Sequence, residues 1–164
     1  MTGPSDRAAE KIAKARFAIY GTGTYPDATF SLRLSYGKVE GWNENGTPVV
    51  PFTYFRGLYE RATGQDPFAL TTKWIAAQNK LNPDTVFDFS TDNDIIGGNS
   101  GSPAIDAQGQ VIGAVFDGNI HSLGGNFGFD DTQNRSVVVS TVAITEALDK
   151  VYDQKALVAN LTAP

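Results

Sequence analysis

A glycine-rich stretch at residues 97–103 constrains the fold of this chain more than any other feature. It consists of Gly-Gly-Asn-Ser-Gly-Ser-Pro, and residues of strand character follow it. Because glycine accepts positive φ without steric cost, the stretch predicts a tight loop. A serine in such a loop can present its hydroxyl outward while neighbouring backbone N–H groups converge on one point. Acyl transfer needs this combination of a nucleophile and donors for a developing oxyanion.

Three other interpretations of this stretch compete with a nucleophile loop. A plain glycine-rich turn between two strands explains the stretch equally well when it is taken alone. A phosphate-binding loop fits poorly, because the Lys-Ser/Thr ending and a following helix are both missing. The Gly-x-Ser-x-Gly elbow of lipases does not fit either, because the spacing differs and the next segment has strand character.

The composition indicates a globular domain and excludes several classes of function. The chain has 164 residues, of which 41% are hydrophobic and 19% charged, which is enough for one domain with a core. A net charge of −5 gives no basic patch for nucleic acid. No apolar run is long enough to cross a membrane, and the charged start of the chain is not a signal peptide. With no cysteine and only His121, we expect no metal site and no cofactor.

The pattern of short strands and turns predicts a mainly β fold with peripheral helices. Alternating apolar and polar residues at positions 29–36 predict a half-buried strand, and Asn-Glu-Asn-Gly at 43–46 predicts a hairpin turn. Residues 104–105 and 111–116 form a second predicted hairpin, which carries the serine loop at one end. The remaining expected strands cover residues 49–53, 85–90 and 136–140. The expected helices cover residues 5–15 (with Ser5 or Asp6 as the N-cap), 54–63, 68–80 and 141–152.

Three separate stretches resemble one peptidase family. They are Tyr-Pro-Asp-Ala-Thr-Phe-Ser-Leu-Arg-Leu-Ser-Tyr-Gly at 25–37, Asn-Asp-Ile-Ile-Gly-Gly-Asn-Ser-Gly-Ser-Pro at 93–103, and Phe-Asp-Gly-Asn at 116–119. In this order and spacing they are similar to the bacterial dipeptidyl-peptidase 7 and 11 family of chymotrypsin-like serine peptidases. The likeness extends from about residue 8 to about residue 161, which makes it more specific than the serine loop alone.

The resemblance implies an architecture and a domain organisation. The fold would be an antiparallel β-barrel like the second barrel of a chymotrypsin-like double-barrel peptidase. Residues 1–164 would form a single domain, the C-terminal half of the catalytic domain. Residues 1–20 would be the end of an inserted helical domain, and residues 140–161 a C-terminal helix.

The resemblance also implies roles for four residues. Ser100 matches the nucleophile, and the N–H groups of Gly98 and Ser100 match the oxyanion hole. Asp117 matches an acidic residue that binds the N-terminal ammonium of the substrate. Gly118 matches the position that sets the S1 pocket, where members that prefer acidic P1 residues carry arginine. Glycine there implies an apolar P1 preference, and Asp94 does not indicate a basic one, since it belongs to the family pattern whatever the P1 residue.

The chain departs from the family pattern at the general base. The triad histidine and aspartate of the family lie upstream of the serine, whereas no histidine precedes Ser100 and His121 follows it. We therefore expect His121 to be a loop residue without a catalytic role, and the chain to be inactive alone. Two other classes stay open: a non-catalytic peptide-binding module derived from such a peptidase, and a structural fragment without activity.

The resemblance gives expectations for partners and location as well. The substrates would be peptides with a free N-terminus, with no nucleic acid or membrane partner. A homodimer of the full-length enzyme is compatible with it, and the location would be periplasmic or secreted. Trp42 and Trp74 are expected to contribute packing rather than ligand stacking.

Overall fold

The structure is a computed structural model that describes residues 3–21, 32–125 and 128–163. The chain divides into two compact units, Met1–Arg33 and Leu34–Pro164. The second unit holds the sheet and every residue singled out above as a candidate for the site.

The described part of the first unit contains helix α1, which spans Pro4–Tyr20. The expected helix is therefore present and is longer than predicted. Its N-cap is Gly3, not Ser5 or Asp6, and the Asp6 carboxylate accepts a hydrogen bond from the Gly3 N–H at 3.0 Å. Pro4 explains the earlier start, because proline suits the first turn, where its missing N–H would have no helical partner. Whether this helix ends an inserted helical domain stays a prediction.

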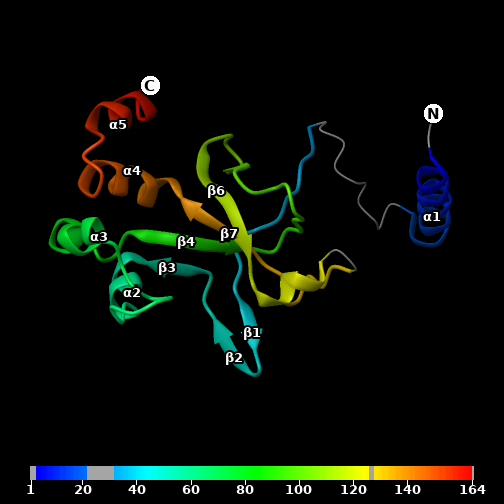
Figure 1. The fold of residues 1–164 in the computed structure, drawn as a ribbon, viewed down its shortest axis with the longest axis horizontal. Helices are drawn as coiled ribbons and strands as arrows, with labels where there is room; N and C mark the ends of the chain where they lie inside the picture. The colour runs from blue at the N-terminus through cyan, green and yellow to red at the C-terminus, as the bar shows by residue number, and fades with distance from the viewer. Residues whose placement is uncertain (1–2, 22–31, 126–127, 164) are drawn as a thin grey trace. The chain divides into compact units, whose positions relative to one another are not determined.

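The second unit is built on a five-stranded antiparallel sheet (Figure 1). Its order is β3 (Phe52–Tyr54), β4 (Val86–Thr91), β7 (Ser136–Ser140), β6 (Val111–Gly118) and β5 (Pro103–Ile105). The predicted strand at 136–140 is reproduced to the residue, and the predicted hairpin is the β5–β6 pair. The mainly β fold class with peripheral helices is confirmed.

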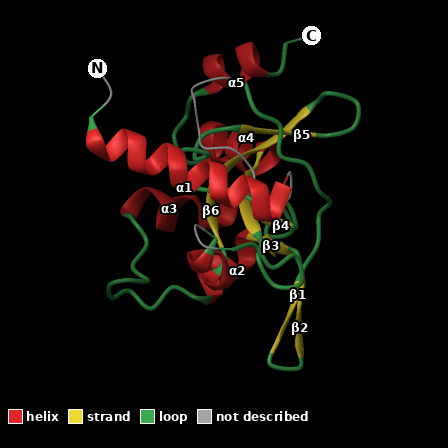
Figure 2. Ribbon diagram, turned by 90° about the vertical axis from the view of Figure 1, so that its right-hand side faces the viewer, coloured by secondary structure: helices red, strands yellow, loops and turns green. Residues whose placement is uncertain are grey.

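A two-stranded hairpin, β1 (Trp42–Glu44) and β2 (Thr47–Val49), accompanies the sheet. It extends away from the sheet in both views (Figures 1 and 2). Asn45 and Gly46 have φ of 50° and 87°, as the two central residues of a type I′ turn require. The turn predicted at 43–46 is confirmed.

The helices of the second unit contribute residues to its hydrophobic core, among them Phe55, Ala77 and Ala143. They are α2 (Phe55–Glu60), α3 (Thr72–Ala77) with the 3₁₀ turn η2 (Gln78–Lys80), α4 (Thr141–Lys150) and α5 (Lys155–Leu161). Phe55 is fully buried, and the rings of Trp74 and Phe87 lie 5.8 and 5.3 Å from its ring. Trp74 thus packs as expected, and the single predicted C-terminal helix is two helices. Among the described helices, none is long and apolar enough to span a bilayer.

The strand expected at residues 29–36 is wrong where the structure describes it. Residues 29–31 lie outside the described part, and residues 32–36 form no strand. Leu32, Leu34 and Tyr36 are 102%, 78% and 87% exposed. A strand needs a hydrogen-bonded neighbour, and in the described ranges this segment first forms a bridge at Val39, opposite Thr91. The alternation of apolar and polar residues is present in this segment, but in its described part no neighbouring strand pairs with it.

Candidate active site

The serine loop connects β4 to β5 and takes the tight conformation that its glycines predict. Gly98 and Gly101 have φ of 100° and 86°, in the region where a side chain is strained. Ser100 lies between them and is exposed to solvent. The loop therefore presents the predicted nucleophile at the surface.

Hydrogen bonds fix this loop internally and against β6. The Asn99 side chain accepts the Ile96 N–H at 3.0 Å, and the Asn99 N–H returns a bond to the Ile96 carbonyl at 3.1 Å. The Gly101 N–H donates to the Val115 carbonyl at 2.7 Å, and Val115 N–H donates to Ser102 at 2.9 Å. Strand β6 therefore holds the two residues that follow Ser100, and the Asn99–Ile96 bonds hold the turn that precedes it.

Two backbone N–H groups of the loop are available to a ligand. Within the described ranges, the N–H groups of Gly98 and Ser100 donate to no other protein atom. Backbone donors are normally satisfied by protein or water, so an exposed pair beside a serine can bind an oxygen atom. The family resemblance assigns these two donors to an oxyanion hole, and that role stays a prediction.

Asp117 and Gly118 end strand β6, two and three residues after Val115, which anchors the loop. Val115 pairs with Val138 and Asp117 with Val137, so Phe116 is an extra residue in a β-bulge. A bulge bends a strand and redirects the side chains next to it. The exposed Asp117 carboxylate accepts the Gly118 N–H at 2.8 Å. Strand β6 thus carries Asp117 two residues after Val115, and Val115 bonds the two residues that follow Ser100.

Gly118 leaves no free space for a side chain of its own. A Cβ atom built on Gly118 would lie 2.2 Å from Ser122 Oγ and 2.8 Å from Ser122 Cβ. Ser122 belongs to the 3₁₀ turn η3 (Ile120–Gly124), and its Oγ donates to the Asn119 carbonyl at 2.7 Å. The glycine therefore allows close packing of Ser122 rather than leaving an open space.

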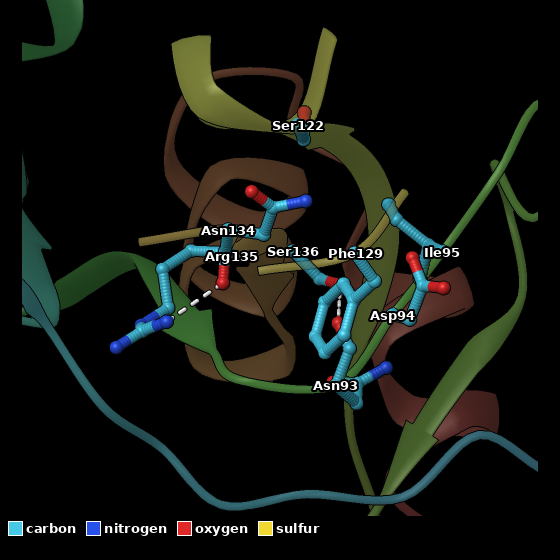
Figure 3. Close-up of a pocket in the computed structure, with 8 residues that line it drawn as sticks. All are labelled: Asn93, Asp94, Ile95, Ser122, Phe129, Asn134, Arg135 and Ser136. Carbon is cyan, nitrogen blue, oxygen red and sulfur yellow. Dashed lines mark hydrogen bonds between the residues drawn. The ribbon is translucent and has the colours of Figure 1, made fainter. Parts of the chain in front are cut away.

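A small pocket lies beside residues 93–95, the segment that precedes the serine loop (Figure 3). Its walls come from the segment that precedes the loop, from η3, and from the residues that lead into β7. The lining residues are Asn93, Asp94, Ile95, Ser122, Phe129, Asn134, Arg135 and Ser136. Ser136 Oγ donates to the Asn93 carbonyl at 2.7 Å and so ties two of these walls together. Ser122, and not Gly118, lines the pocket from the β6 side.

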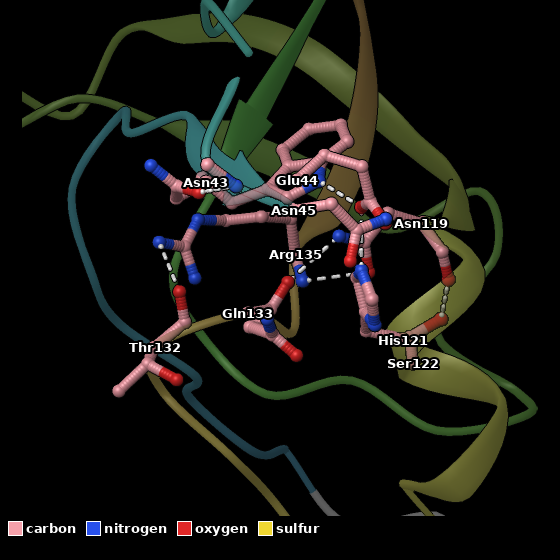
Figure 4. Close-up of polar contacts among 11 residues, drawn as sticks. Asn43, Glu44, Asn45, Asn119, His121, Ser122, Thr132, Gln133 and Arg135 are labelled. Carbon is pink, nitrogen blue, oxygen red and sulfur yellow. Dashed lines mark hydrogen bonds and ion pairs between the residues drawn. The ribbon is translucent and has the colours of Figure 1, made fainter. Parts of the chain in front are cut away.

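His121 is bound to the β1–β2 hairpin (Figure 4). Its Nε2 lies 2.7 Å from Glu44 Oε2, and the Trp42 indole N–H donates to the same carboxylate oxygen at 2.9 Å. These two hydrogen bonds, that of His121 first, lower the pKa of Glu44 below its usual value. The contact therefore links η3 to the hairpin, and Trp42 contributes a hydrogen bond to the same carboxylate.

Arg135 is a structural residue of this region that the sequence did not identify. It is only 3% exposed, and its guanidinium donates to the carbonyl groups of Gly41 at 2.8 Å, Asp131 at 2.9 Å and Asn134 at 2.7 Å. Its backbone N–H donates to Asn119 Oδ1 at 3.1 Å. A lone arginine before a strand carries no signal for such burial, because the Gly41 carbonyl that it reaches lies 94 residues away in the sequence.

Metal ligands are not gathered at this site. In the part of the chain that the structure describes, no group of three or more His, Cys, Asp or Glu side chains is placed to hold a metal ion.

Solved structures of Porphyromonas endodontalis DPP11 are similar in fold to this chain. The structure of Porphyromonas endodontalis DPP11 in complex with the dipeptide Arg-Asp superposes with a TM-score of 0.80 at 22% identity, over 91% of this chain and 23% of that one. The fold is therefore the one found in that portion of DPP11.

The sequence matches the Peptidase S46 family over residues 1–163, and the chain belongs to this family. It is 35% identical to dipeptidyl-peptidase 7 of Phocaeicola vulgatus over 84% of this chain. It is 32% identical to the Asp/Glu-specific dipeptidyl-peptidase of Flavobacterium psychrophilum over 88% of this chain. The chain spans only about a fifth of the length of these relatives, 20% and 22% respectively.

Proposed function

We propose that this chain supplies the serine nucleophile and the oxyanion hole of a dipeptidyl-peptidase that removes N-terminal dipeptides from peptides. Ser100 is the nucleophile, and the N–H groups of Gly98 and Ser100 stabilise the oxyanion. The observation that carries this proposal is the serine loop, with Ser100 exposed between two left-handed glycines and two N–H groups available beside it. Membership of the peptidase S46 family gives the reaction class.

Asp117 gives the proposed enzyme its preference for free N-termini. A buried substrate ammonium needs a compensating charge, and the Asp117 carboxylate lies at the end of the strand that anchors the serine loop. An internal peptide offers a neutral amide there and gains nothing from the carboxylate. In this proposal the general base comes from outside this chain, because the family's triad histidine lies upstream of the serine and the only histidine here, His121, contacts the hairpin at Glu44.

The test is activity of the complete S46 enzyme, meaning this chain joined to the remaining S46 sequence that its gene encodes. Dipeptidyl-naphthylamides should be hydrolysed by the complete enzyme, and Ser100→Ala should remove turnover without changing the unfolding transition. Ser102→Ala is the matched control, since it changes the next serine of the same loop. Activity that survives Ser100→Ala would overturn the proposal, as would a gene that encodes no further S46 sequence. A peptide-binding module is the alternative, and binding of dipeptides without any turnover would support it.

The proposed P1 preference is apolar, and Gly118→Arg tests it. A guanidinium at position 118 would favour Asp or Glu at P1 through charged hydrogen bonds. The single variant clashes with Ser122, because a Cβ at position 118 would lie 2.2 Å from its Oγ. The double variant Gly118→Arg with Ser122→Gly removes that clash and should shift kcat/KM towards acidic P1 residues. A wild-type enzyme that already prefers acidic P1 residues would contradict this role of Gly118.

A periplasmic or secreted location follows from the family resemblance and is part of the same proposal. Cell fractionation with an antibody against this chain tests it, and recovery in the cytoplasmic fraction alone would contradict it.

A further inference from the structure

Two consecutive turns form the serine loop, and Asn99 belongs to both. The Asn99 N–H donates to the Ile96 carbonyl at 3.1 Å, and the Asn99 carbonyl accepts the Ser102 N–H at 3.0 Å. The third residue of each turn is a glycine with positive φ, 100° for Gly98 and 86° for Gly101, as a type II turn requires. The nucleophile therefore lies directly after the residue at which the two turns join.

The side chain of Asn99 closes the first of these turns a second time. Its Oδ1 accepts the Ile96 N–H at 3.0 Å, so the N–H and the carbonyl of Ile96 are both bound by the same residue. Within the described ranges, no other side chain forms a hydrogen bond with residues 96–102. Asn99 is half-buried, whereas Gly98 and Ser100 on either side of it are exposed. One amide is therefore the side-chain support of this loop.

The Gly98 N–H belongs to the central peptide of the first turn. Type I and type II turns have the same closing hydrogen bond and differ in the orientation of this peptide. A type I turn would therefore point the Gly98 N–H to the other side of the loop. Gly97 and Gly98 occupy the two central positions, and glycine accepts either orientation. The backbone alone thus fixes the direction of this N–H weakly, and the second bond across the turn, from Asn99, restricts it.

We propose that Asn99 is a positioning residue that holds the Gly98 N–H towards the oxyanion of the reaction. This inference rests on the proposed function, which makes the Gly98 N–H an oxyanion donor. Asn99 acts through the backbone of the turn, since its Oδ1 binds the Ile96 N–H. The oxyanion develops in the transition state, so loss of this bond should lower kcat more than it changes KM.

The experiment measures steady-state kinetics of Asn99 variants of the complete S46 enzyme on dipeptidyl-naphthylamides. Asn99→Ala should lower kcat by between about tenfold and the roughly 10²- to 10³-fold that loss of an oxyanion donor costs, with little change in KM. Asn99→Ser should recover part of the loss, because a serine hydroxyl forms the same contact more weakly. Asn43→Ala is the matched control. The Asn43 Oδ1 accepts the Gly46 N–H at 2.6 Å in the β1–β2 turn, and loss of this bond should lower stability without lowering kcat.

Two inhibitors distinguish positioning from a general loss of structure. In a dipeptide boronic acid with a free N-terminus, boron bonds to the Ser100 oxygen and becomes a tetrahedral anion that resembles the transition state. The corresponding dipeptide alcohol has no carbonyl or anion at that position. Asn99→Ala should weaken inhibition by the boronic acid by the same factor as kcat/KM, while inhibition by the alcohol should change by less than about twofold.

The outcomes separate this inference from the proposed function. If turnover persists in Ser100→Ala, the proposed function fails. If turnover depends on Ser100 but Asn99→Ala keeps kcat within about twofold, or weakens both inhibitors equally, only the inference on Asn99 is overturned. Asn99→Ser replaces Asn99→Ala if the alanine variant does not fold. The same difference between the two inhibitors is expected of it, and equal changes would overturn the inference.

Discussion

At the scale of single residues, the bulge at Phe116 matters most, because it changes the strand pairing of Asp117 at the end of β6. Asp117 pairs with Val137 although Val115 pairs with Val138, so the bulge shifts its place in the ladder by one residue. The exposed carboxylate has one contact in the described structure, with the N–H of its neighbour Gly118. It therefore keeps acceptor capacity for a substrate ammonium.

Asp117→Asn in the complete S46 enzyme should lower kcat/KM for free-amine dipeptide substrates by about 1.5 to 3 kcal/mol, the worth of a charged hydrogen bond. N-acetylated analogues should lose much less, because they carry no ammonium. Steady-state kinetics of both substrate types in both proteins checks this. Equal losses for the two types would mean that Asp117 only supports the end of the strand.

Asp88 predicts a dependence of stability on pH. Burial in the middle of β4 raises the pKa of Asp88 to about 6 from an ordinary value of 3.8, against a smaller opposing effect of its hydrogen bond with Thr53. The pKa of Asp88 is higher in the folded than in the unfolded state. The contribution of Asp88 to the free energy of unfolding is therefore fully present below pH 3.8 and is lost as the pH rises through about 6. The neutral Asp88→Asn should escape this loss.

Asp88→Asn should be more stable than the unmodified chain at pH 7.5, and equally stable at pH 4. The gain should be about 1 to 2 kcal/mol, after allowance for the solvent that still reaches this carboxyl. Urea unfolding across this pH range measures it. Asp131→Asn, at an exposed position, is the matched control, and a gain of the same size there would contradict the burial effect.

At the scale of elements, local pattern predicted the elements whose determinants are local. The type I′ turn at Asn45 and Gly46 and the strand Ser136–Ser140 follow from turn chemistry and β-branched residues. Residues 29–36 had an equally clear alternation, yet the described part of that segment is not a strand. Strand formation depends on a neighbour, which a single sequence does not reveal.

The candidate site divides in the same way. The serine loop could be predicted, because its glycines act through their own φ angles. Two features could not be predicted: the close approach of Ser122 to Gly118, and the hydrogen bonds from the buried Arg135 guanidinium to backbone carbonyl groups. Both depend on the placement of η3 and of the β1–β2 hairpin, which only tertiary packing determines.

The hydrogen bonds from the Arg135 guanidinium to backbone carbonyl groups predict that this side chain stabilises the fold. Its guanidinium connects Gly41, before β1, to the segment that leads into β7. Arg135→Ala removes the donor from the buried Asn134 and from the carbonyls of Gly41 and Asp131, and should cost about 3 kcal/mol of unfolding free energy. Arg135→Lys should recover only part of this, because one ammonium cannot reach the same set of acceptors.

Thermal and urea unfolding of the chain checks this, with Arg16→Ala on the exposed helix α1 as the control. A loss below about 1 kcal/mol for Arg135→Ala, which is within the usual range of surface substitutions, would show that water replaces the guanidinium at these carbonyls.

At the scale of the whole molecule, the length of the chain bears directly on its activity. The chain covers 20% of dipeptidyl-peptidase 7 of Phocaeicola vulgatus and 23% of the DPP11 chain. Its own residues include a serine, two available N–H groups and a carboxylate at one end of a sheet, but only one histidine. That histidine binds Glu44 at the hairpin. A serine hydroxyl without a base to accept its proton is a weak nucleophile.

The isolated 164-residue chain should therefore show no measurable hydrolysis of dipeptidyl-naphthylamides. Loss of one member of a catalytic triad lowers kcat by about 10⁴ to 10⁶, which takes turnover below detection in a standard assay. The measurement needs purified chain with a cooperative unfolding transition, so that inactivity is not mistaken for misfolding. Ser100→Ala of the same chain gives the background rate. Turnover above that background would show that a base is present within the chain, and His121→Ala would then test whether the histidine leaves Glu44 to serve Ser100.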